Sequence, residues 1–124
     1  MFKKISVIMF VLLFVVLPAN ARGLNKEQFA TMRLITQSMV LAVMCDVLKS
    51  DIYISAKMAL AVEMPAQDFI PSGSKYHSDY KKITAESFKK IAAAEKNTPN
   101  FACIAGLSLF GPNGSVAPGL LKPV

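Results

Sequence analysis

The stretch 25-NKEQFATMRLITQSMVLAVMCDVLK-49 decides the fold. Asn25, followed three residues later by Gln28, is typical of the capping box that begins a helix. Apolar side chains then recur at steps of three or four, the spacing of one helix face. They are Phe29, Met32, Ile35, Met39, Val43 and Val47. Little polar surface remains from residue 39 to residue 48, and a helix that is apolar nearly all round usually lies at the centre of a bundle. We expect a core helix over residues 25–49.

Start and stop signals predict three further helices downstream. Ser50 or Asp51 can cap a helix over residues 52–63, and Pro65 ends it. A helical period continues over residues 75–96, and Thr98 with Pro99 begins a last helix over 99–110. The expected inner residues are Ile54, Met58, Ala61 and Val62 in the second helix and Tyr76, Tyr80, Ile83, Phe88 and Ile91 in the third. The predicted fold is all-α, a small four-helix bundle.

Residues 1–21 have the layout of a cleaved secretory signal peptide. Lys3 and Lys4 precede a largely apolar run of 13 residues, 5–17, and a small-x-small site ends at Ala21. A run of 13 is short of the roughly 20 apolar residues that a transmembrane helix needs. Cleavage after Ala21 lowers the net charge from +6 to +4. We expect an exported protein, periplasmic or extracellular, whose single domain spans residues 22–124 and has no membrane span.

The two cysteines of the chain, Cys45 and Cys103, lie 58 positions apart. Exported proteins retain disulfides, and a bridge closing such a loop stabilises a fold by about 4 kcal/mol. A reactive thiol or a metal ligand is the alternative. Neither cysteine belongs to a Cys-x-x-Cys motif or has a histidine nearby in the sequence. We therefore expect one disulfide that joins the first helix to the last.

Two features are candidates for an interaction surface. One is a stripe of lysines at seven-residue intervals along the third helix: Lys75, Lys82, Lys89 and Lys96. A strip that binds anionic surfaces and a solvated outer face are both possible, and the interrupting acids Asp79 and Glu86 favour the solvated face. The other feature is the irregular C-terminal tail, 112–124. Its Leu120 and Leu121 either pack back onto the bundle or form an exposed apolar segment for a partner.

No constellation of catalytic residues is visible in the sequence. His77 is the single histidine, the six glycines form no phosphate loop, and the eight acids lie singly. We expect no metal and no cofactor, and the charge surplus is too small to indicate nucleic acid. The leading hypothesis is a small exported protein that acts by binding another protein and is not an enzyme. The alternatives are a secreted effector acting on a host or competitor cell and a small hydrolase that uses His77.

Overall fold

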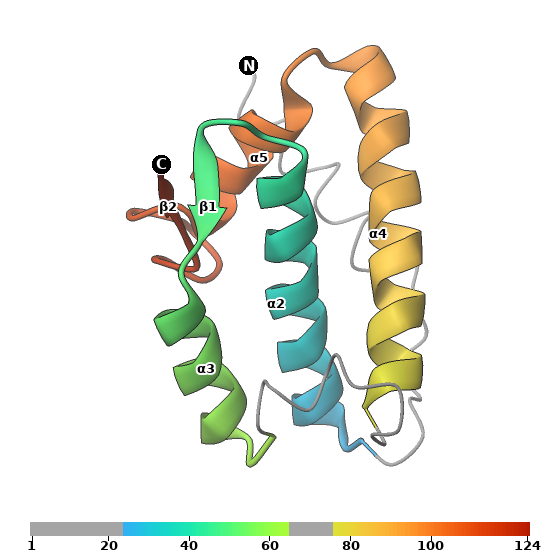
Figure 1. Ribbon diagram of the computed structural model, residues 1–124, viewed down its shortest axis with the longest axis vertical. Coiled ribbons are helices and arrows are strands. Elements are labelled where there is room, and N and C mark those ends of the chain that lie inside the picture. The colour runs from blue at the N-terminus through green and yellow to red at the C-terminus, as the bar shows by residue number, and fades with distance from the viewer. Residues whose placement is uncertain (1–23, 65–75) are drawn as a thin grey trace.

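The computed structural model describes residues 24–64 and 76–124, and these ranges form four helices and two short strands (Figure 1). In chain order they are α2 (Lys26–Val43), β1 (Leu48–Ser50), α3 (Ile52–Ala61), α4 (His77–Asn97), α5 (Phe101–Phe110) and β2 (Leu121–Pro123). The mostly helical fold confirms the predicted all-α class, to which it adds a small sheet. The expected signal peptide, 1–21, and Lys75 lie outside the described residues.

The central helix is α2, as its apolar sequence predicted. Its capping box is formed: the Gln28 N–H donates to Asn25 Oδ1 at 2.8 Å, and the Asn25 N–H donates to Gln28 Oε1 at 3.2 Å. In Figure 1, α3 lies on one side of α2 and α4 on the other, and α2 and α4 run in the same direction. One apolar cluster, around Phe29, Met32 and Ile83, fills the end where α2 begins. A second joins the other end of α2 to α5 and the sheet.

The helix predicted over 25–49 ends six residues early, at Val43. The chain turns through Met44 and Cys45 and enters β1 at Leu48, so the expected inner position of Val43 and Val47 is wrong: both side chains are exposed. No proline or glycine marks this end in the sequence. The helix stops because residues 48–50 pair with a strand that lies more than 70 positions later in the chain.

The start of α5 also differs from its prediction, which placed the first turn at Pro99. The helix begins at Phe101, and Asn100 precedes it in the left-handed region, with φ of 64°. The Ala102 N–H, one of the donors that a first turn leaves unpaired, donates to Glu95 Oε2 at 2.8 Å. A carboxylate from α4 therefore caps α5, in place of the local Thr98 cap that the sequence indicated.

The C-terminal tail is partly regular, contrary to the prediction. β2 pairs antiparallel with β1, with Leu48 opposite Pro123, Lys49 opposite Lys122 and Ser50 opposite Leu121. The flanking hydrogen bonds run from the Val124 N–H to the Val47 carbonyl and from the Asp51 N–H to the Leu120 carbonyl. Pro123 therefore occupies a pair that exchanges no hydrogen bonds, where its missing N–H costs nothing. We call β1 and β2 together the ribbon.

The predicted disulfide between Cys45 and Cys103 is present, with a Cα–Cα distance of 5.1 Å. It joins the turn after α2 to the first part of α5. Gly106 of α5 allows a close approach of the ribbon, because a Cβ there would lie 2.9 Å from Leu48 Cδ1 and 3.1 Å from Leu121 Cδ1. α5 and the ribbon are thus fixed to one end of α2, while α3 leaves from the ribbon toward the other end (Figure 1).

Candidate functional site

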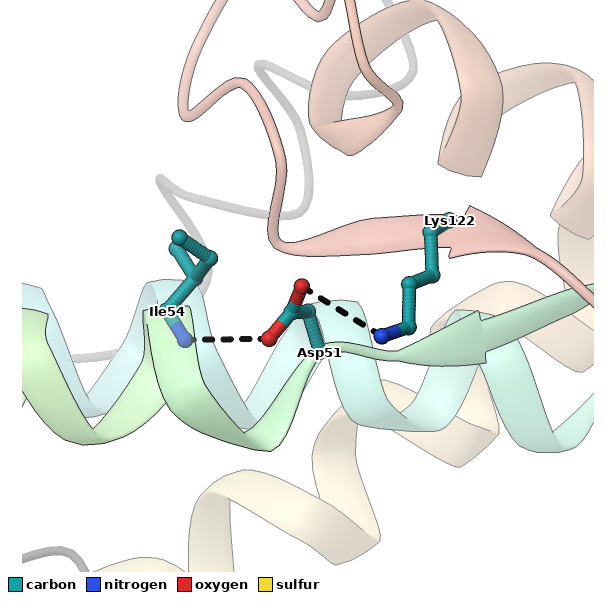
Figure 2. Close-up of polar contacts among 3 residues, drawn as sticks. All are labelled: Asp51, Ile54 and Lys122. Carbon is teal, nitrogen blue, oxygen red and sulfur yellow. Dashed lines mark hydrogen bonds and ion pairs between the residues drawn. The ribbon is translucent and has the colours of Figure 1, made fainter.

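The N-terminal end of α3 is fixed by Asp51. Its Oδ1 accepts a hydrogen bond from the Ile54 N–H at 3.2 Å, and its Oδ2 lies 3.6 Å from Nζ of Lys122 on β2 (Figure 2). The Ile54 hydrogen bond, with the Lys122 ammonium as a smaller contribution, lowers the pKa of the Asp51 carboxyl. This residue thus starts the helix and also ties it to the last strand of the chain.

Most of the surface of α3 is apolar and faces outward. Ser55 and Ala59, four residues apart, are the two buried positions of the helix. The other sides carry Ile52, Tyr53 and Leu60, which are 80%, 71% and 60% exposed. We call the surface of Ile52, Tyr53, Ala56, Lys57, Leu60 and Ala61 the outer face of α3.

The outer face of α3 carries one charge, the ammonium of Lys57, which lies 5.7 Å from the centre of the Tyr53 ring. A cation at that distance from a ring face is weakly attracted to it, so Lys57 also covers part of the ring. Ala61, predicted to point inward, is exposed, because the helix packs through its small Ser55–Ala59 side. Ile54, Met58 and Val62, also predicted to point inward, are partly buried against the apolar clusters. Ile52, Tyr53 and Leu60 are left in contact with solvent.

The C-terminal end of α3 has an unusual residue at its turn. The Met64 N–H donates to the Ala59 carbonyl and the Glu63 N–H to the Leu60 carbonyl, both at 2.9 Å, which is the Schellman arrangement. Met64 is fully buried, as is Ala59 below it. The residue in the left-handed position, with φ of 56°, is Glu63, where glycine is usual. A carboxylate there also lies at the negative end of the helix dipole.

Further exposed side chains lie on the ribbon and at its end away from α3. Val47 and Val124, joined by a backbone hydrogen bond of 3.1 Å, are 62% and 78% exposed. Lys49 and Lys122 lie directly opposite each other in the register and are both exposed. Asp51 offsets the charge of Lys122, so Lys49 supplies the net positive charge at this end of α3.

The residues predicted from sequence as an interaction surface are not brought together. Lys82, Lys89 and Lys96 are exposed on α4, which α2 separates from α3 (Figure 1). Leu120 and Leu121 are fully buried in the second apolar cluster. Of the two alternatives for these leucines, packing back onto the bundle is the one observed, because the pairing of β2 with β1 brings them onto α2 and α5, and they form no part of an exposed surface.

His77, the residue of the hydrolase alternative, is the first residue of α4 and is half-buried. Neither cysteine can serve it as a nucleophile, since both sulfurs are in the disulfide. Within residues 24–64 and 76–124, no three side chains of the His, Cys, Asp and Glu types are grouped so as to hold a metal ion. Over the same ranges, no helix combines the length and the apolar character that crossing a membrane requires.

Comparison with protein-family models, with curated proteins and with solved structures finds no match to this chain.

The outer face of α3 was not predicted from the sequence. The helical pattern was used to assign inner positions only, and Ile52, Tyr53 and Leu60 were given no role. A signal was present in the side-chain sizes. The stripe of Ser55 and Ala59 suits close packing, and each large side chain except Ile54 and Met58 falls on the other sides of the helix.

Proposed function

We propose that this protein is an exported binding protein and that its docking surface for another protein is the outer face of α3. The observation that carries the proposal is the exposure of Ile52, Tyr53 and Leu60 on one ten-residue helix. Full burial of a large apolar side chain stabilises a complex by about 1.5–3 kcal/mol. A helix that exposes three of them is typical of a protein that buries them on binding.

The residue types of this face also support protein binding. Tyrosine is enriched where proteins bind each other, because its ring is large, rigid and able to form a hydrogen bond. Charged residues are depleted at the centres of such interfaces, and Lys57 is the one charge between residues 52 and 61. The rim is polar: Lys49 and Asp51 precede the face, and Glu63 follows it.

The disulfide and the N-terminal sequence support export. Disulfides persist in oxidising compartments, and the Cys45–Cys103 bridge joins the turn after α2 to α5. Residues 1–21 carry the pattern of a secretory signal. The intact mass of the protein recovered from the periplasm or the culture medium tests this part of the proposal. We expect a chain that begins at Arg22 and is two hydrogens lighter than its reduced form.

Site-specific photocrosslinking tests the docking surface. A photoreactive amino acid replaces Tyr53, and the matched control replaces Phe88, which is 38% exposed on α4. In producing cells, we expect a discrete crosslinked product from position 53 that is absent from position 88, and mass spectrometry then identifies the protein attached. Equal products from both positions, or none from position 53, would contradict the proposal.

A further inference from the structure

The outer face of α3 has a pattern that is complementary to itself. Ile52, Ala56 and Leu60 lie four residues apart and so form one ridge along the helix. When two such helices pack in opposite directions about a two-fold axis at Ala56, Ile52 of each lies against Leu60 of the other. The small side chain of Ala56 allows the helices to approach closely at the axis.

The charges at the two ends of α3 are complementary in the same arrangement. Lys49 lies before the helix and Glu63 after it, and both are exposed. The positive end of the helix dipole is at Ile52, next to Lys49. Antiparallel packing brings Glu63 of each molecule to the positive end of the other, whereas parallel packing brings like charges together. Asp51 does not oppose this contact, because Lys122 offsets its charge.

We propose that the outer face of α3 binds the same face of a second copy of this chain, in the antiparallel direction. This inference rests on the proposed function, since it names the partner of that docking surface. It also gives a reason for Glu63, which is unfavourable within a single molecule in both its backbone conformation and its place on the helix dipole. Across the two-fold axis, its carboxylate meets a lysine and a helix N-terminus.

The size of the outer face of α3 limits the affinity that we expect for the dimer. A ten-residue helix is about 15 Å long, and stable interfaces bury about 800 Å² on each partner. One helix face is smaller than that. We therefore expect a dimer that dissociates on dilution and weakens with salt.

Sedimentation equilibrium of the exported, oxidised protein over a range of concentrations tests the proposal. We expect a monomer–dimer equilibrium for the wild type and loss of the dimer in Leu60→Asp. Glu63→Lys alone and Lys49→Glu alone should each raise the dissociation constant about tenfold at low salt. The variant with both reversals should bind more tightly than either single reversal but less tightly than the wild type, because the Lys–Glu pairs are restored with their charges exchanged while the helix dipoles are not reversed.

Two reversals on α4 serve as charge-matched controls, Glu86→Lys for Glu63→Lys and Lys89→Glu for Lys49→Glu. We expect neither to change the dissociation constant by more than about twofold. Circular dichroism of each variant verifies that the fold is retained. A wild type that stays monomeric at every concentration would overturn the inference, as would a double reversal that binds no more tightly than the single reversals. A monomer that still crosslinks through position 53 to a different protein would overturn this inference and leave the proposed function standing.

Discussion

Helices α3 and α5 are both ten residues long and both mostly apolar, yet they differ in burial. Six residues of α5 are buried, among them Phe101, Leu109 and Phe110, whereas α3 buries Ser55 and Ala59. α5 contacts α2, α4 and both strands, and α3 packs chiefly on α2. The difference shows that an apolar composition makes a helix suitable for burial but does not determine whether other elements cover it. Here the disulfide and the ribbon cover α5 and leave α3 exposed.

The largest expected effect concerns the bridge that fixes α5. Replacing both Cys45 and Cys103 by Ala should lower the free energy of unfolding by about 4 kcal/mol, because the unfolded chain is no longer held in a closed loop. Urea unfolding of the purified protein measures the change. Wild type treated with a reductant is the control and should unfold near the same midpoint as the variant. A wild type that resists urea equally with and without the bridge would show that packing alone fixes α5.

Substituting one leucine in each helix compares the contributions of α5 and α3 to stability directly. Leu109 of α5 is 2% exposed and Leu60 of α3 is 60% exposed. Leu109→Ala should cost about 3 kcal/mol, since it removes buried methyl groups and leaves a cavity. Leu60→Ala should change stability by less than about 0.5 kcal/mol in the monomer. Thermal unfolding at low protein concentration measures both. Similar losses in the two variants would mean that α3 is covered in the monomer.

The attachment of α3 to the ribbon is the third test. Asp51→Ala should lower the free energy of unfolding, because the Ile54 N–H loses its acceptor, while Asp51→Asn keeps the cap and should lower it less. Folding lowers the pKa of Asp51, so its carboxylate stabilises the fold above its unfolded pKa of about 3.9. That contribution is lost as the pH falls through the lower pKa of the folded state. Between pH 6 and pH 2, wild type should lose more stability than Asp51→Asn does.

The smallest expected effect is a gain in stability. Glu63→Gly should stabilise the monomer by about 0.5–1 kcal/mol, since glycine adopts a positive φ without strain and removes an acid from the negative end of the dipole. Lys57→Gly is the control in the interior of the same helix, where glycine should cost about 1 kcal/mol. Urea unfolding at protein concentrations below the dimer dissociation constant measures the change in stability of both variants. A loss of stability in Glu63→Gly would mean that its side chain has a structural role.

Local signals in the sequence predicted those helix boundaries that depend on residues close along the chain. The capping box of Asn25 and Gln28 and the cap of Asp51 are formed as expected, because a cap joins residues that are close along the chain. The end of α2 at Val43 was missed, since it depends on a strand near the other end of the sequence. The cap of α5 by Glu95 was missed for a related reason: the donor and the acceptor belong to different helices.

For the candidate site, the sequence supplied the helix but not its exposure. Leu120 and Leu121 were candidates for an exposed surface and are buried, whereas Ile52 and Leu60 were assigned to no surface and are exposed. Both pairs are aliphatic; Leu120 and Leu121 lie at β2, and Ile52 and Leu60 lie on α3. Nothing in the residues themselves distinguishes the pairs, because their burial depends on the pairing of β1 with β2.

The sequence by itself determined the mostly helical character, the placing of α2 at the centre and the single possible pairing of the cysteines. Periodicity and capping depend on residues that are close along one helix. Two cysteines allow only one intramolecular pairing. Only the tertiary structure decided which apolar surfaces meet. The ribbon and the disulfide close long stretches of chain, so α5 is enclosed and the outer face of α3 remains available to a partner.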